Sequence, residues 1–115
     1  MSDDIFCKII KGEVNADFVY RDDKVVVFRD VNPKAPVHLL VMPVQHFAGI
    51  ADFAEEDGHL LGKMLRVAHE MAAKEGLSEG YRLIINEGVH GGKTVEHLHL
   101  HLLGGRQLGS KLVKE

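Results

Sequence analysis

Five short runs of the chain combine β-branched, aromatic and other apolar residues and are bounded by turn residues, which is the pattern of β-strands. The third run is apolar except for His38, and a tight turn at residues 22–23 separates the first two. The predicted strands cover residues 18–21, 24–30, 37–42, 81–87 and 95–103. A glycine-rich segment separates the last two strands.

One longer stretch repeats its apolar residues at intervals of three and four, the period of a helix with one buried face. Asp52, with Glu55 three residues later, resembles a capping box that would begin this helix, and Gly76 would end it. The predicted core-facing residues are Leu60, Leu61, Met64, Leu65, Ala68, Met71 and Ala72. A shorter helix is predicted over residues 5–11, with Asp4 as its cap and Gly12 as its end.

These elements predict an α+β fold in a single domain, residues 1–115, with a five-stranded, mainly antiparallel sheet, one long helix and one short helix. Hydrophobic residues make up 45% of the chain and charged residues 27%, as in ordinary globular proteins. The net charge of −3 argues against nonspecific binding to nucleic acid. A single cysteine, an acidic N-terminus and the absence of a long apolar stretch predict a cytoplasmic protein with no membrane association.

The last predicted strand carries three histidines at every second residue. Successive strand residues face opposite sides, so Leu98, Leu100 and Leu102 share one face. His97, His99 and His101, with Val95 and Leu103, share the other. The leucine face is expected to pack on the long helix, and the histidine face to point toward solvent or a groove. A solvated face that happens to be rich in histidine is possible, but three imidazoles in register favour a functional site.

Metal binding is one function that the histidines suggest, because zinc accepts imidazole nitrogen. Same-face residues of a strand lie about 6.7 Å apart, so His97 and His101 would be separated by roughly 13 Å. One extended strand can therefore hardly bring all three rings to a single ion. A pair would need help from His38 or His46, and no cysteine or carboxylate cluster in the sequence indicates such a site.

The glycine-rich segment 88–94 suggests anion binding instead. It is one residue short of the phosphate-binding P-loop pattern, and a strand rather than a helix follows it, so the P-loop assignment fails. A glycine loop can nevertheless turn successive backbone N–H groups toward an anion, and Thr94 adds a hydroxyl beside the histidines. An oxyanion cradle next to three imidazoles is typical of phosphate chemistry. An ordinary turn between two strands explains the glycines equally well.

The run HLHLHLL, residues 97–103, resembles the histidine triad motif, in which three histidines alternate with apolar residues. Three longer segments resemble the Hint branch of the histidine triad (HIT) superfamily, the purine nucleoside phosphoramidases. These segments are IFCKIIKGEV, VVVFRDVNPKAPVHLLVMP and NEGVHGGKTVEHLHLHLLGGRQLG. The resemblance covers nearly the whole chain.

This resemblance implies a HIT-like fold and a homodimer whose two sheets join into ten strands. It implies a purine nucleotide substrate, an adenosine or guanosine 5′-phosphoramidate, whose P–N bond is hydrolysed to release the nucleoside monophosphate. His99 would be the nucleophile that forms a nucleotidyl-histidine intermediate, and His101 would bind the phosphate oxygens. His97 and His38 would brace the strand. No cofactor or metal is expected, because a neutral imidazole is already nucleophilic near pH 7.

The nucleotide pocket is also implied by the resemblance. Asp30 would accept hydrogen bonds from both ribose hydroxyls. The purine would lie among Ile5, Phe6, Ile9, Phe28 and Val31. The ribose and phosphate would contact Asn86, Gly92, Thr94 and Val95. Taken alone, the apolar residues are more typical of a core, and Asp30 is equally typical of a loop cap.

Two features depart from the family pattern. Some relatives bind structural zinc through a Cys-x-x-Cys pair and two histidines, but the residue three before Cys7 is Asp4, so a zinc site is not expected here. The chain has no tryptophan, and its tail RQLGSKLVKE resembles the bacterial type rather than the eukaryotic Trp-Pro-Pro-Gly ending. In a dimer this tail is expected to reach toward the partner's active site. Three other functions stay open: a dinucleoside polyphosphate hydrolase, a nucleotide-binding or scaffolding protein, and a metal-binding protein.

Overall fold

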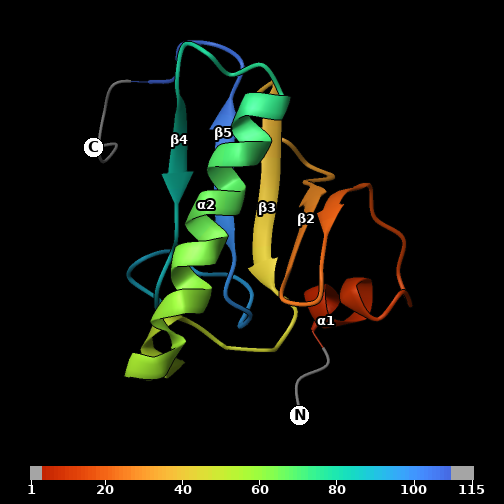
Figure 1. Ribbon diagram of the computed structural model, residues 1–115, viewed down its shortest axis with the longest axis vertical. Helices are drawn as coiled ribbons and strands as arrows, with labels where there is room; N and C mark the ends of the chain where they lie inside the picture. Colours follow the sequence, from red (N-terminus) through yellow and green to blue (C-terminus); the bar gives the residue numbers. More distant parts are fainter. Residues whose placement is uncertain (1–3, 110–115) are drawn as a thin grey trace.

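The computed structural model describes residues 4–109, which form one antiparallel sheet and two α-helices (Figure 1). The strands are β1 (Phe18–Arg21), β2 (Val25–Arg29), β3 (Val37–Pro43), β4 (Tyr81–Ile84) and β5 (Leu100–Gly104). The helices are α1 (Ile5–Ile10) and α2 (Gly58–Lys74), and two short 3-10 helices, η1 (Ile50–Asp52) and η2 (Glu55–Asp57), precede α2. The strand order is β1-β2-β3-β5-β4. The predicted α+β fold class is confirmed, while the dimer stays a prediction.

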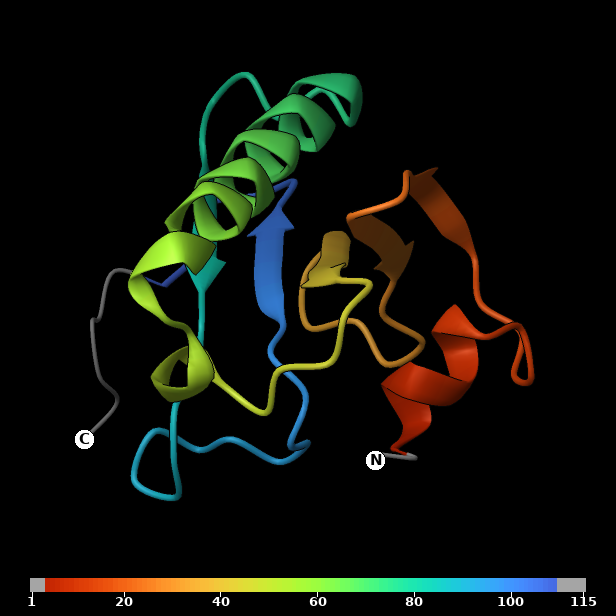
Figure 2. The same ribbon diagram turned by 60° about the horizontal axis from the view of Figure 1, so that its bottom comes forward.

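The two helices lie apart, with the strands between them (Figure 2). Alternate strand residues divide into two cores on opposite faces of the sheet. The core under α2 contains Val25, Val27, Leu39, Val41, Leu98, Leu100 and Leu102 with Met64, Val67, Ala68 and Met71 of the helix. The core under α1 contains Val26, Phe28, Leu40 and Met42 with Phe6, Ile9 and Ile10 of the helix. The leucines of the histidine segment therefore face α2, as predicted.

The N-terminal helix α1 begins where its sequence predicts. The Asp4 side chain accepts a hydrogen bond of 2.8 Å from the Cys7 amide, which satisfies one of the free N–H groups of the first turn. Its buried residues are Phe6, Cys7, Ile9 and Ile10. Ile5, predicted to belong to the same apolar stripe, is instead 45% exposed. The helix thus presents one apolar side chain to solvent next to its buried face.

The long helix α2 begins later than its sequence predicts. Asp52 does not cap it: the Asp52 carboxylate accepts hydrogen bonds from the amides of Ala48 and Gly49 and closes a turn in the preceding loop. The first helical residue is Gly58. The predicted end at Gly76 is confirmed, because this residue has a φ of +76°, a conformation that favours glycine.

The last strand is shorter than predicted. Only Leu100–Gly104 pairs with neighbours, and residues 95–99 follow an irregular path before the sheet. The β3–β5 ladder ends at the pair of Val41 with Leu100. The Leu98 amide donates instead to the Phe47 carbonyl of the loop after β3. Within the described residues neither α-helix is long and apolar enough to cross a membrane.

Candidate active site

The four histidines predicted to carry chemistry lie on the α1 side of the sheet. His38 is in β3, His101 is in β5, and His97 and His99 are in the irregular segment just before β5. The expected exposure of the histidine face is wrong for two of the triad, because His97 is 0% and His99 is 7% exposed. Phe6 of α1 covers both, with its ring centroid 5.8 Å from that of His97 and 4.9 Å from that of His99.

The His99 ring is held by the backbone of its own segment. Its Nδ1 atom lies 2.7 Å from the carbonyl oxygen of His97. A carbonyl can only accept, so Nδ1 carries the proton and donates it. In the neutral ring, Nε2 therefore has a free lone pair. The carbonyl that selects this tautomer belongs to His97, two residues earlier in the same segment.

A chain of hydrogen bonds determines which nitrogen of the His101 ring carries the proton. The backbone N–H of Lys34 donates to Nδ1 of His38 over 3.0 Å, so His38 carries its proton on Nε2. This Nε2 lies 2.9 Å from Nδ1 of His101 and 3.4 Å from a carboxylate oxygen of Asp30. His101 accepts at Nδ1 and therefore holds its own proton on Nε2. The Lys34 amide has no sequence signature, and sequence reasoning missed it.

The two triad rings thus present opposite chemistry to their surroundings. The ring centroids of His99 and His101 are 5.0 Å apart. His99 offers a lone pair at Nε2, while His101 offers an N–H. Burial, followed by the positive charge of His99 and His38, lowers the pKa of His101 to about 4, although Asp30 opposes this shift. Burial likewise lowers the pKa of His38. Both rings are therefore neutral at pH 7.

His97 faces a different group of side chains. Its Nδ1 lies 3.3 Å from an oxygen of Asp4 and 3.5 Å from the sulfur of Cys7. Burial lowers the pKa of His97, and the Asp4 carboxylate opposes the shift. The His97 carbonyl, rather than its ring, accepts the hydrogen bond from His99, and the bracing role of His97 stays a prediction.

The glycine-rich segment forms a tight loop between β4 and the histidines. Gly88 and Gly92 have φ angles of +72° and +83°, which favour glycine. The side-chain amide of Asn86 donates to the Gly91 carbonyl over 2.7 Å, and this hydrogen bond holds the loop together. Thr94 is exposed and Val95 packs on the core under α1. The loop therefore has the backbone freedom that an anion cradle requires.

The predicted purine-binding residues divide into two groups. Ile5 and Val31 are exposed apolar residues, at 45% and 93%. Phe6, Ile9 and Phe28 are buried in the core under α1, where the Phe6 and Phe28 rings meet edge to face with centroids 5.9 Å apart. The buried group thus fills the core, as the alternative interpretation of these residues held, and only the exposed group offers apolar surface to a ligand.

Asp30 uses both carboxylate oxygens. One accepts a hydrogen bond of 2.8 Å from the Asn32 amide, which is the loop-capping role considered for it. The other lies near Nε2 of His38. Asp30 is only partly buried, so its side chain remains accessible beside the histidines.

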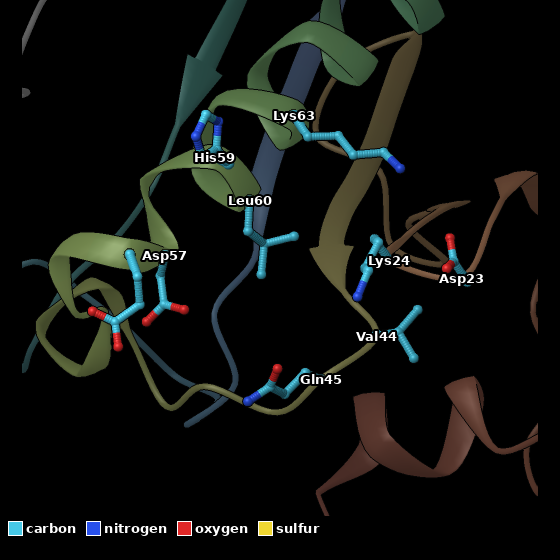
Figure 3. A pocket seen from close by; sticks show the side chains of 9 residues that line it. Asp23, Lys24, Val44, Gln45, Asp57, His59, Leu60 and Lys63 are labelled. Atoms are coloured by element: carbon cyan, nitrogen blue, oxygen red, sulfur yellow. The ribbon is translucent and has the colours of Figure 1, made fainter.

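A hollow of about 450 Å³ lies elsewhere, at the start of α2 (Figure 3). Its lining is mostly charged and polar, and Figure 3 shows Lys63 and Leu60 of α2 facing Lys24 and Val44 across it. None of the four histidines lines it. Its size alone does not make it the site of phosphate chemistry.

Among residues 4–109, two groups of side chains have the spacing to hold a metal ion. Asp30, His38 and His101 form one, within the histidine site itself. Asp4, Cys7, His46 and His97 form the other, with ligand atoms all within 4.8 Å of one another. The members of the second group come from three segments of the chain, which the fold brings together.

Comparison with known proteins identifies the family. The family model described as scavenger mRNA decapping enzyme C-term binding matches residues 3–113. The chain is 49% identical to the purine nucleoside phosphoramidase of Escherichia coli over 109 residues, covering 94% of this chain and 92% of that protein. It is 55% identical to an uncharacterized HIT-like protein of Synechococcus elongatus over 109 residues, covering 94% and 96%.

Solved structures agree with this result. A HIT family hydrolase from Legionella pneumophila superposes with a TM-score of 0.91 at 46% identity, covering 94% of this chain and 97% of that one. A HIT family hydrolase from Clostridium thermocellum superposes with a TM-score of 0.93 at 42% identity, covering 98% and 99%. Together with the histidine geometry, these likenesses show that the chain belongs to the histidine triad family.

Proposed function

We propose that this protein is a purine nucleoside phosphoramidase, a hydrolase that cleaves the P–N bond of nucleoside 5′-phosphoramidates. The observation that carries the proposal is the hydrogen bond from Nδ1 of His99 to the His97 carbonyl, which selects the tautomer whose neutral ring has its lone pair at Nε2. A neutral imidazole with an oriented lone pair is the nucleophile that this reaction needs. The relative in Escherichia coli, at 49% identity, carries the same activity in its name.

The reaction proceeds in two displacements. Nε2 of His99 attacks the α-phosphorus, a P–N bond to the ring forms, and the P–N bond to the amine breaks. The leaving nitrogen takes up a proton and departs as the free amine. Water then attacks the phosphorus of the nucleotidyl-histidine, giving the nucleoside monophosphate and returning the lone pair to His99. Splitting one displacement into two lowers the highest barrier.

We assign to His101 the role of donating a hydrogen bond to the phosphate oxygens and the leaving amine. Its proton sits on Nε2 because Nδ1 accepts from His38, and the Lys34 amide fixes the tautomer of His38 in turn. An N–H in this position stabilises negative charge that develops on phosphate oxygens. The backbone N–H groups of the glycine loop, with Gly92 and Thr94, supply further donors to the same anion.

The nucleoside binds beside α1 in this proposal. Asp30 accepts from the ribose hydroxyls, and the exposed side chains of Ile5 and Val31 cover the purine. The pocket is further lined by Val95, Asn86 and the buried rings of Phe6 and Phe28. The Asn86 amide is already used by the Gly91 carbonyl, so Asn86 contributes to binding chiefly by holding the loop.

A homodimer completes the proposal. Strand β4 pairs only with β5 among the described strands, so one edge of the sheet is open to a second copy. Two such edges, paired about a twofold axis, give the ten-stranded sheet. The C-terminal tail expected near the partner's site lies mostly in residues 110–115, outside the described residues.

Steady-state kinetics test this function directly. The specificity constant kcat/KM is measured for an adenosine 5′-phosphoramidate and for a diadenosine polyphosphate with the same preparation. We expect the phosphoramidate to be preferred. Preference for the polyphosphate would assign the chain to the other hydrolases of the superfamily, and tight AMP binding without turnover of either compound would indicate a binding protein.

A further inference from the structure

Lys93, near the end of the glycine-rich segment, carries a buried charge that the proposed displacement does not use. Its side chain is only 6% exposed. Lysine is almost never buried to this extent unless its ammonium group is paired, because an unpaired charge in the interior is costly. The groups that hold the Lys93 ammonium therefore indicate what this residue does.

The Lys93 ammonium has three partners among the described residues. Its Nζ atom donates to the carbonyl oxygen of Ala48 over 2.9 Å, a hydrogen bond that the charge strengthens. It also lies 3.7 Å from Oε1 of Glu87 and 3.3 Å from Oε1 of Glu96. Glu96 is 73% exposed, so its pairing with Lys93 contributes little. The Ala48 carbonyl and the half-exposed Glu87 are thus the partners that hold the buried ammonium.

The glycine loop is closed at its base and attached there to the loop after β3. The Lys93 amide donates to the Gly88 carbonyl over 3.1 Å, which brings the two ends of the glycine loop together. Glu87, just before Gly88, accepts a hydrogen bond of 3.1 Å from the Ile50 amide. The side chains at both ends of the glycine loop therefore reach the same short stretch, residues 48–50.

Residues 47–50 also contact the histidine segment. The amide of Leu98, one residue before His99, donates to the Phe47 carbonyl over 2.6 Å. The Asp52 carboxylate accepts hydrogen bonds from two backbone N–H groups of the same stretch and fixes its conformation. One stretch of backbone thus determines how the glycine loop and the histidine segment lie relative to each other.

Gly49 gives the charged pair of Glu87 and Lys93 the space that it needs. The φ of Gly49 is −170°, an extended conformation that any residue adopts, so the backbone itself does not require glycine. A Cβ atom at this position would lie 2.6 Å from Nζ of Lys93 and 2.8 Å from Oε2 of Glu87. The absence of a side chain at Gly49 therefore lets both charged groups approach the backbone of this stretch.

We infer that Lys93 is a positioning residue for phosphate binding, because its ammonium holds the glycine loop in the place where Thr94 meets the phosphate. Thr94 follows Lys93 directly in the chain, and a displacement of about 1 Å in an aligned group can lower a rate roughly 100-fold. The ammonium is paired with Ala48 and Glu87, so it acts through the loop rather than as a ligand of the phosphate. The inference rests on the proposed function, because that function places the phosphate at this loop.

Ligands with and without a phosphate test this role in the full-length protein. Lys93→Met keeps the apolar stem and removes the charge, so the glycine loop loses its attachment to the loop after β3. We expect AMP to bind roughly tenfold or more weakly by calorimetry, as for the loss of one hydrogen bond to a charged group. Adenosine, which has no phosphate, should bind with unchanged affinity. Wild-type AMP affinity in Lys93→Met, or an equal loss for AMP and adenosine, would overturn the positioning role.

Two comparisons separate this result from other causes. Lys63→Met removes a paired lysine on α2, whose Nζ lies 2.9 Å from an oxygen of Asp22, and should leave AMP affinity unchanged. Circular dichroism and the melting temperature show that each variant is folded during the titration. A wild-type chain that does not bind AMP would overturn the proposed function and this inference together. A loss of affinity in Lys63→Met equal to that in Lys93→Met would overturn the inference alone.

Gly49→Ala tests the same attachment from the other side. The added Cβ displaces the charged ends of Lys93 and Glu87 without changing either residue, so the affinity for AMP should fall while that for adenosine is kept. In the double variant with Lys93→Met, the loss should stay close to that of Lys93→Met alone, because substitutions that act through one contact do not add. Additive losses would show that Gly49 and Lys93 act separately and would overturn their shared role in holding the loop.

Discussion

The Nδ1 atom of His99 donates to the carbonyl oxygen of His97 over 2.7 Å, so the middle ring of the triad is oriented by the first residue of the same motif. The His-x-His spacing makes this contact possible, because the backbone carbonyl two residues before His99 lies beside its ring. The motif therefore sets the orientation of the proposed nucleophile and the tautomer of its neutral ring.

The first prediction concerns this ring. His99→Ala removes the nucleophile and should reduce kcat for an adenosine phosphoramidate by several orders of magnitude, because no other lone pair is oriented in the same way. AMP binding, measured by calorimetry, should persist, since Asp30 and the glycine loop are unchanged. His69→Gln, on the exposed face of α2, serves as the control and should keep wild-type turnover. Near-normal hydrolysis by His99→Ala would remove the nucleophilic role.

The histidine segment also shows how far the sequence could predict the site. Alternation correctly placed Leu98, Leu100 and Leu102 in the core under α2 and the histidines on the other face. It predicted too long a strand, because the period of side chains does not reveal whether the backbone has a partner. β4 ends at Ile84 and pairs there with His101, so nothing on that side continues the ladder to residues 95–99.

Short sequence motifs predicted the structure less reliably where the same residues fit two different local conformations. The pair Asp52 and Glu55 has the spacing of a cap, but Asp52 serves a 3-10 turn and α2 begins at Gly58. Two further contacts in the structure were not predicted from the sequence. Lys34 contacts His38 through its backbone amide, and the group of Asp4, Cys7, His46 and His97 forms where α1 packs on the sheet.

The second prediction is a pH dependence of stability. The pKa of His101 is lowered by burial to about 4, below its ordinary value of 6.5. Between these two values the unfolded chain binds the proton and the folded chain does not, so stability falls as the pH falls through this window. Protonation of His101 in the unfolded chain should lower the unfolding free energy by at most about 2 kcal/mol between pH 7 and pH 5. Urea unfolding at both pH values measures it.

The comparison variant for this effect is His101→Gln, which cannot titrate. Its loss of stability between pH 7 and pH 5 should be smaller than that of the wild type. His38 and His97, whose pKa values are also lowered by burial, still contribute in the same direction in both proteins. An equal loss in the two proteins would show that His101 is not the group that titrates.

The third prediction tests the core under α2. Leu102 is completely buried in it, so Leu102→Ala should lower the unfolding free energy by about 2–5 kcal/mol. Leu65 was predicted to share that core but is 42% exposed, so Leu65→Ala should change stability by no more than about 0.5 kcal/mol. Urea unfolding of the matched pair measures the difference. Equal effects would contradict the burial of these two leucines.

The fourth prediction concerns the glycine loop beside the proposed phosphate site. A Cβ atom at Gly91 would lie 2.2 Å from the carbonyl oxygen of Glu87 and 2.8 Å from its nitrogen, so Gly91→Ala must move the loop backbone. The N–H groups expected to hold the phosphate should lose their alignment, and we expect weaker AMP binding and a lower kcat/KM. At Gly62 in α2 an added Cβ would meet no atom within 4 Å apart from its chain neighbours and the backbone of its own helix. Gly62→Ala should therefore stabilise the protein by about 0.5–1 kcal/mol and leave AMP affinity unchanged. Wild-type AMP affinity and turnover in Gly91→Ala would show that the loop does not hold the phosphate.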